Sequence, residues 1–111
     1  MYDKKHAGAI NEHLGISHLL KQGFEVFRNV SQHGLIDLLA VKDDKILKVD
    51  VKGVKPRPDG SIRRGRLSHQ QIEMGIVCVA VHQDGRAYID DAPRRVSSTP
   101  SPVQRPRRRR S

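Results

Sequence analysis

Two apolar runs rich in β-branched residues occupy residues 34–53, and a polar Lys-Asp-Asp-Lys segment at residues 42–45 separates them. In the second run Leu47, Val49 and Val51 alternate with polar residues, which is the period-two pattern of a β-strand. A tight turn at the polar segment would fold the stretch into a hairpin. The pattern therefore predicts two antiparallel strands near the middle of the chain.

Each predicted strand carries an acid inside its apolar pattern, Asp37 in the first and Asp50 in the second. If Val41 faces Ile46 across the turn, Asp37 lies directly opposite Asp50 on the same face of the sheet. Side chains placed in this way have Cβ atoms about 4.5–5.5 Å apart, and like charges there repel. A divalent cation held between the carboxylates would offset the repulsion. The alternative is a pair of edge-strand charges that resist aggregation.

The flanking sequence predicts two helices and three further strands. An apolar arc without Pro favours a helix over residues 3–22 that is capped by Asp3, while Ser68 and Gln71 form a capping box that opens a short second helix. Gly34, in the turn before the hairpin, is expected to take a positive φ. The remaining elements are strands at residues 24–30, 76–81 and 86–90, the last two joined by a tight turn at Asp84-Gly85.

In order, these elements predict an α/β (α+β) fold, αβββαβ(β), in which a central mixed sheet is flanked by helices and the first three strands form an antiparallel meander. At 111 residues the chain holds one domain, which we place at residues 1–92. From residue 93 onward Ser, Pro and Arg dominate, so residues 93–111 are predicted to be a disordered basic tail.

The composition argues against a membrane-spanning protein and against a secreted protein. Only 36% of residues are hydrophobic, and no run approaches the roughly 20 apolar residues of a membrane span. The N-terminus is polar and charged, unlike a secretory signal. The single cysteine, Cys78, lies in the apolar run IVCVAV and is expected to be a core thiol. We therefore expect a cytoplasmic protein with no membrane partner and no small-molecule cofactor.

The net charge of +9 is unevenly distributed. Residues 1–92 hold 14 Lys and Arg against all 12 acids, whereas residues 93–111 hold seven Arg and no acid. A basic tail of this kind favours a polyanion such as nucleic acid. Arg107 and Arg108 in the terminal RPRRRR are therefore candidate DNA contacts; a nuclear-import-like patch and a dispensable segment are the other interpretations.

A second basic segment follows the hairpin. Residues 53–66 contain two Pro and three Gly and are predicted to form a loop. We expect its cations to contact the phosphate backbone, because the loop starts at the edge of the acidic pair; a merely solvated loop is the alternative. These cations are Lys55, Arg57, Arg63, Arg64 and Arg66.

The first predicted helix carries a third acid. Glu12, Ile16 and Leu19 are spaced i, i+4, i+7, so Glu12 falls within the apolar arc. If this helix packs over the hairpin, Glu12 joins the acidic pair. Otherwise it sits at the edge of the arc and reaches water.

Converging carboxylates suit Mg²⁺, which prefers oxygen ligands and keeps several waters. Hydrolysis of a phosphodiester needs a cation to neutralise developing charge, a positioned water and a stabilised leaving oxygen. Lys52, two residues beyond Asp50, could orient the water or stabilise charge. The acids and this lysine form the minimum set for such a reaction.

With these residues the chain resembles the PD-(D/E)XK nuclease superfamily. The resemblance lies in Glu12, in Gly-Leu-Ile-Asp at residues 34–37, in Asp-Val-Lys at residues 50–52 and in the order of elements. It covers roughly residues 5–90. Ile36 stands where the family name has proline. Members of this size with a first-helix Glu include junction resolvases, homing endonucleases and phage nucleases.

The resemblance implies roles for these residues. Asp37 and Asp50 would bind the metal, with Glu12 as a further metal or water ligand and the backbone carbonyl of Val51 in the metal shell. Lys52 would be the catalytic lysine.

Some members of the family also use a glutamine on the helix after the third strand, which here means Gln70 or Gln71. Gln71 is favoured because the apolar Ile72 follows it. Its simpler role is that of a capping-box residue.

These features predict a Mg²⁺-dependent DNA endonuclease in which Mn²⁺ substitutes for Mg²⁺. Because a domain of this size covers little of a DNA duplex, we expect a homodimer that brings two active sites to the two DNA strands. A non-catalytic nucleic-acid-binding domain would also use the basic loop and tail, with structural acids. An RNA-directed nuclease is a third interpretation, disfavoured by the few aromatic residues.

Overall fold

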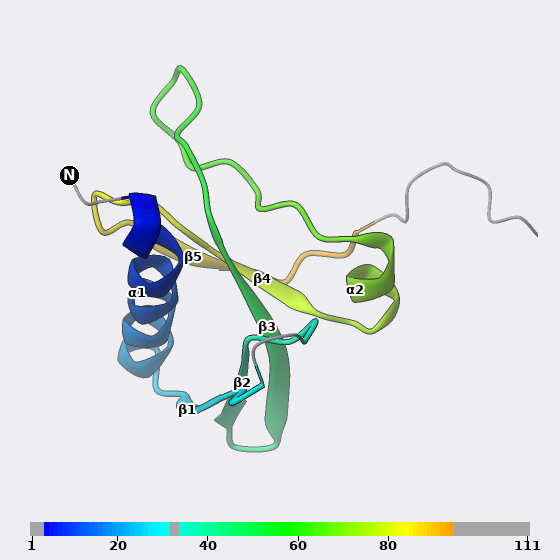
Figure 1. Cartoon of the computed structure of the whole chain (residues 1–111). Coiled ribbons are helices and arrows are strands. Elements are labelled where there is room, and N and C mark those ends of the chain that lie inside the picture. The colour runs from blue at the N-terminus through cyan, green and yellow to red at the C-terminus, as the bar shows by residue number, and fades with distance from the viewer. Residues whose placement is uncertain (1–3, 32–33, 95–111) are drawn as a thin grey trace, which may run out of the picture.

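The computed structural model describes residues 4–31 and 34–94, which form a five-stranded mixed sheet with α1 on one side and α2 on the other (Figure 1). The elements in chain order are a 3-10 turn at Lys4–His6, α1 (Ala7–Lys21), β1 (Glu25–Arg28), β2 (Leu38–Lys42), β3 (Lys45–Gly53), α2 (His69–Glu73), β4 (Val77–Val81) and β5 (Ala87–Asp90). The predicted mixed sheet between two helices is confirmed. The predicted tail falls largely outside the described residues, including Arg107 and Arg108.

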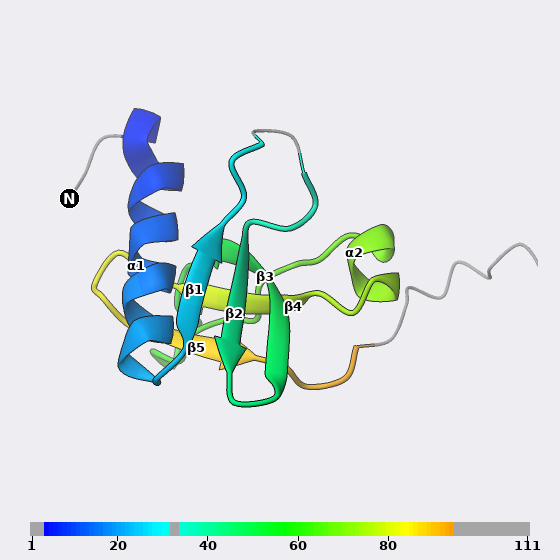
Figure 2. The same ribbon diagram turned by 90° about the horizontal axis from the view of Figure 1, so that it is seen from below.

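The strands are ordered β1-β2-β3-β4-β5 across the sheet. Only β3 and β4 run parallel; the other three neighbouring pairs are antiparallel. The predicted meander of the first three strands and the predicted terminal hairpin are therefore confirmed. In Figure 2, β1, β2 and β3 lie side by side between the two helices.

Two clusters of apolar side chains cover the two faces of the sheet. On one face Leu19 of α1 packs with Leu38, Val49 and Val79. On the other face the loop between β3 and α2, together with α2 itself, covers a smaller cluster that includes Cys78. The predicted core thiol is confirmed, and burial raises its pKa to about 11. None of the described helices is long and apolar enough to cross a bilayer.

Several details of the elements differ between the prediction and the structure. The first helix begins at Ala7 after the 3-10 turn, and the predicted cap Asp3 lies outside the described residues. Gly34 does not take a positive φ. A Cβ there would lie 2.5 Å from Nδ2 of Asn29, so a side chain at this position would displace the Asn29 amide from the carbonyl of Ile36. The predicted loop is not wholly irregular, because Pro56 and Ile62 form an isolated antiparallel bridge.

Candidate functional site

The β2–β3 register brings the two predicted acids together. Leu38 pairs with Val49 and Lys42 pairs with Lys45, as a turn at residues 42–45 requires. Asp37 precedes β2 by one residue, and its backbone N–H donates to the carbonyl of Val49 at 2.8 Å, although Val49 already faces Leu38. Two successive residues thus face Val49, as in a β-bulge, so Asp37 is not the ladder partner of Asp50 that the sequence predicts. Its charge still lies close enough to Asp50 to raise the pKa of that acid.

The Asp37 carboxylate is fixed against β3. Its Oδ2 accepts a hydrogen bond of 2.9 Å from the backbone N–H of Val51. Both the backbone and the side chain of Asp37 thus hold it beside the Asp-Val-Lys segment. The backbone of Val51, which was predicted to join a metal shell, is next to the Asp37 carboxylate.

Asp50 is the most unusual carboxylate of the site. It is 6% exposed, and among the described residues its buried Oδ2 has no hydrogen-bond partner. The ammonium of Lys52 is 3.3 Å from that oxygen, close enough for an ion pair but without hydrogen-bond geometry. Burial and the neighbouring charge of Asp37 raise the pKa of Asp50, and Lys52 and Gln71 offset only part of the shift.

Gln71 is the predicted capping-box residue and also lies beside Asp50. It closes the capping box, since its N–H donates to Ser68 Oγ and its Oε1 accepts from the Ser68 N–H. Its side chain is buried, its Nε2 donates to the carbonyl of Leu35 at 2.9 Å, and it lies close enough to Asp50 to affect its pKa. Gln70 is exposed.

Glu12 lies near the pair, but its carboxylate is engaged elsewhere. Its Oε1 accepts a hydrogen bond of 2.9 Å from Arg28. Glu12 and Asp37 line the same pocket of about 540 Å³. Within the described part of the chain, no three His, Cys, Asp or Glu side chains form a group that could hold a metal ion. A three-acid metal site stays a prediction.

The two-carboxylate set fits a hard divalent cation. Asp50 supplies a buried oxygen with no hydrogen-bond donor among the described residues, Asp37 supplies a second carboxylate close enough to raise the pKa of Asp50, and oxygen is the ligand type that Mg²⁺ prefers. A buried oxygen without a donor is destabilising unless something else pairs with it. The ammonium of Lys52 already forms an ion pair with this oxygen at 3.3 Å, and a divalent cation would offset the remaining charge of the two acids.

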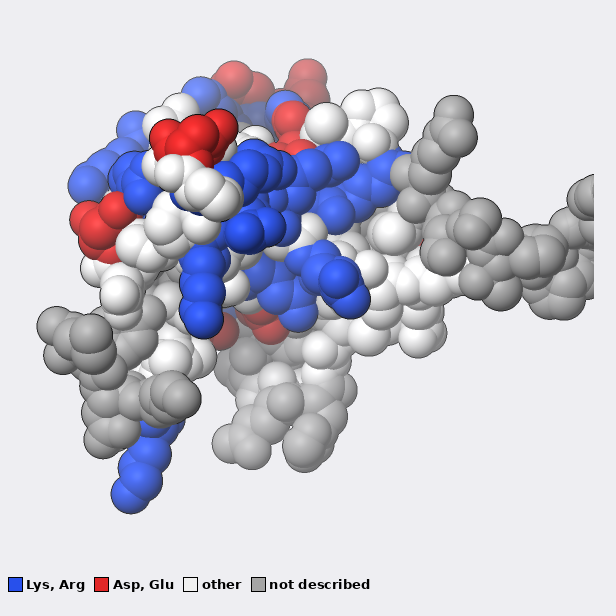
Figure 3. Space-filling model, turned by 90° about the horizontal axis from the view of Figure 1, so that it is seen from above, with Lys and Arg blue, Asp and Glu red and all other residues white. Residues whose placement is uncertain are grey.

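The loop after β3 forms a basic groove beside this site. A pocket of about 760 Å³ contains Lys52 and Gln71 together with four of the five predicted loop cations. Figure 3 shows Lys and Arg side chains gathered over this side of the molecule. The four cations are Lys55, Arg63, Arg64 and Arg66. The fifth, Arg57, does not line the pocket and donates to the carbonyl of Ile62 and to Ser61 within the loop.

Arg64 has a structural contact that the sequence did not indicate. It donates to both carboxylate oxygens of Asp90, from Nε at 2.6 Å and from a terminal nitrogen at 2.9 Å. Arg94 also donates to Asp90, at 2.9 Å. Asp90 is 6% exposed, and its position at the end of an apolar strand was the available signal.

The next loop residue, Gly65, lies directly on the site. A Cβ at Gly65 would be 2.9 Å from Cβ of Lys52 and closer still to Sγ of Cys78. The contact between Arg64 and Asp90 therefore holds the loop where it touches the side chain of Lys52.

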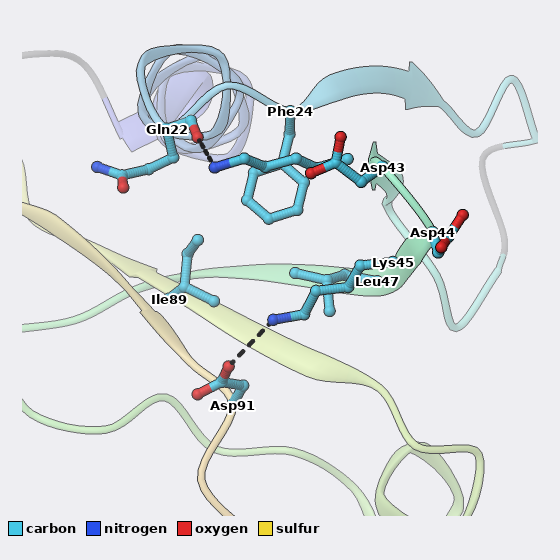
Figure 4. Close-up of a pocket in the computed structure, with 9 residues that line it drawn as sticks. Gln22, Phe24, Asp43, Asp44, Lys45, Leu47, Ile89 and Asp91 are labelled. Atoms are coloured by element: carbon cyan, nitrogen blue, oxygen red, sulfur yellow. Dashed lines mark hydrogen bonds and ion pairs between the residues drawn. The ribbon is translucent and has the colours of Figure 1, made fainter.

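A second pocket of about 760 Å³ surrounds the β2–β3 turn (Figure 4). Lys42 donates across it to the carbonyl of Gln22, and Lys45 is 4.0 Å from Asp91. Phe24, Leu47 and Ile89 are among its apolar lining residues. None of the predicted site residues lines this pocket, so it is separate from the acidic pair.

The fold is similar to a solved structure, that of the bacterial homing endonuclease I-Ssp6803I. The TM-score is 0.58 and the sequence identity is 21%, over 79% of this chain and 68% of that chain. No protein-family model matches the sequence, and a search of curated proteins finds no relative. The chain therefore has an endonuclease-like fold.

Proposed function

We propose that the chain is a divalent-metal-dependent DNA endonuclease of the PD-(D/E)XK type. The observation that carries the proposal is the Asp50 carboxylate. It is buried, it lies close enough to Asp37 for that charge to raise its pKa, and its Oδ2 has no hydrogen-bond donor among the described residues. A buried carboxylate oxygen without a hydrogen-bond donor is costly even beside the ammonium of Lys52, and acids with perturbed pKa values concentrate at functional sites. The likeness to a homing endonuclease supports the same assignment.

Asp37 and Asp50 would hold the metal, Mg²⁺ or Mn²⁺, with the carbonyl of Val51 and with Glu12 as additional ligands. The metal would supply charge stabilisation at the scissile phosphate and a more acidic bound water. For Glu12 to take part, its carboxylate must leave Arg28, which now donates to it.

The chain's own side chains complete the chemistry. Lys52 has a side chain that is 41% exposed and an ammonium 3.3 Å from Asp50, so it faces both the acids and solvent. It can hold the attacking water or stabilise negative charge on the phosphate. Gln71, fixed by Leu35 and Ser68, is a rigid amide donor beside Asp50.

The groove lined by Lys55, Arg63 and Arg66 would bind the DNA backbone next to these residues. Phosphate contacts of this kind fix the position of a duplex without reading its sequence. A homodimer would bring a second site to the second strand. Arg107 and Arg108 would add further phosphate contacts from the tail.

The test is a cleavage panel of end-labelled linear duplex, four-way junction, flap and single-stranded DNA, with Mg²⁺, Mn²⁺ or EDTA. We expect metal-dependent cutting of at least one DNA form and none in EDTA. Binding without cutting of every form would overturn the proposal in favour of a non-catalytic nucleic-acid-binding domain. Cutting of the matching RNAs in place of the DNAs would reassign the substrate.

A further inference from the structure

One face of the sheet carries an apolar patch that no described helix covers. Phe27 of β1 pairs with Leu39 of β2, and Val41 of β2 pairs with Ile46 of β3, so these four side chains share one face. Phe27 is 49% exposed, Leu39 38% and Ile46 64%. We call these four residues the β1–β3 patch. Their strand neighbours Val26, Ala40 and Leu47 point the other way, into the core beside α1.

Two opposite charges stand at opposite corners of the patch. Glu25 pairs with Val41 at one end of β1, and Lys48 pairs with Leu39 on β3, so both project from the patch face. Both residues are exposed. Lys48 donates one hydrogen bond to the carbonyl of Met74, and an ammonium has three donors, so two more are available to an acid.

The patch and its charges are complementary to themselves. A two-fold axis passing between Glu25 and Lys48 sets each Glu25 opposite Lys48 of a second copy and brings apolar side chains against apolar side chains. Isologous contacts of this kind are the commonest route to homo-oligomers.

We propose that a second copy of this chain docks on the β1–β3 patch. Six side chains bury less than the roughly 800 Å² per partner of a standard interface, so the dimer is weak and concentration-dependent. The inference gives a surface to the homodimer that the proposed function calls for. It rests on the exposed patch and its charges, so it can fail or hold independently of nuclease activity.

Sedimentation velocity of the full chain over a range of concentrations tests the contact. We expect the wild type to shift from monomer to dimer as concentration rises, and Ile46→Asp to raise the dimer dissociation constant by at least about tenfold. The matched control is Leu20→Asp, because Leu20 is a 55% exposed leucine on α1, outside the patch. Circular dichroism melts confirm that each variant is folded.

Charge reversal tests the geometry. Glu25→Lys and Lys48→Glu should each weaken self-association at least about tenfold. In either variant the two contacts between positions 25 and 48 across the two-fold axis both bring like charges together. The double variant should recover self-association. An equimolar mixture of the two single variants should form heterodimers, because each contact then joins opposite charges.

A wild type that stays monomeric at every concentration would overturn the proposal. Equal weakening by Ile46→Asp and Leu20→Asp would also overturn it, as would single charge reversals whose mixture does not associate. Because sedimentation is measured without DNA, an inactive protein that still dimerises through the patch would contradict the nuclease proposal alone.

Discussion

Arg64 and Asp90 form a two-point contact, with donor–acceptor distances of 2.6 and 2.9 Å, between the basic loop and the last strand. This contact joins two segments 26 residues apart in the sequence. Arg64 thus differs from the other loop cations that were predicted to bind DNA, because its guanidinium pairs with a buried carboxylate. Its first role is to hold the loop in place.

Arg64→Ala should therefore lower stability. Loss of two charge-assisted hydrogen bonds is expected to reduce the free energy of unfolding by about 1–2 kcal/mol, less than for a fully buried pair because Arg94 still pairs with Asp90. Urea denaturation measures the change. Arg63→Ala, on the exposed neighbouring cation, should cost less than about 0.5 kcal/mol. Equal losses for the two variants would show that the contact does not support the fold.

The exposed cations of the groove should contribute to DNA binding, in contrast to Arg64, which contributes to stability. Arg63→Ala combined with Arg66→Ala should weaken DNA binding and lower the slope of log Kd against log salt concentration by about 0.9 for each phosphate that the variant no longer neutralises. Fluorescence anisotropy at several salt concentrations measures both quantities. Lys45→Ala, at the β2–β3 turn, is the control and should leave the slope unchanged. An unchanged slope in the double variant would remove the groove from the DNA interface.

Gly65 should tolerate no side chain. The added methyl group of Gly65→Ala meets Lys52 at 2.9 Å and Cys78 more closely, so the loop must shift. Overpacking of this kind typically costs about 1–3 kcal/mol, measured by thermal or urea denaturation. Gly8→Ala is the control, because a Cβ at Gly8 on α1 has no atom within 4 Å and alanine favours the helix. A stable Gly65→Ala with unchanged cleavage would contradict the close approach.

Asp50 should make stability depend on pH. Its pKa is raised in the folded chain by burial and by Asp37, so between the ordinary carboxyl pKa and the raised value the folded state binds more protons than the unfolded state. Stability contributed by this group is therefore present at low pH and is lost as pH rises through that window.

In metal-free buffer at pH 7, Asp50→Asn should be more stable than the wild type by about 1 kcal/mol, because it removes a buried charge that lacks a donor. The two unfolding curves should converge near pH 3, where the acid is protonated in both states. Asp44→Asn, on the exposed turn, serves as the control. A destabilised Asp50→Asn at pH 7 would show that the ion pair with Lys52 outweighs the cost of burying the charge.

The hairpin and its acids could be predicted because their signals are local. Alternation in residues 45–53 defines β3, a polar segment defines the turn, and together they determine the register from Leu38–Val49 to Lys42–Lys45. The departure from this register at Asp37 could not be predicted from alternation. The capping box of α2 is equally local, since Ser68 and Gln71 are three residues apart. Each of these features depends on a few neighbouring residues and on fixed strand or helix geometry.

Contacts between distant segments could not be predicted in the same way. The pairing of Glu12 with Arg28 and that of Arg64 with Asp90 depend on how α1 and the loop pack against the sheet. The parallel pairing of β3 with β4 depends on the loop and α2 that connect them. The exposure of Phe27 and Ile46 likewise depends on which part of the sheet the other elements cover, and no periodicity indicates it.

Asp50 is the residue on which the proposed metal-dependent cleavage of DNA depends. Single-turnover cleavage of a supercoiled plasmid by wild type, Asp50→Asn and Asp44→Asn, with Mg²⁺ and with EDTA, tests this role most directly. We predict Mg²⁺-dependent cutting by the wild type and Asp44→Asn, and a rate for Asp50→Asn lower by at least about a hundredfold with DNA binding retained. Cleavage by Asp50→Asn at the wild-type rate, or no cleavage by the wild type with Mg²⁺ or Mn²⁺, would contradict it.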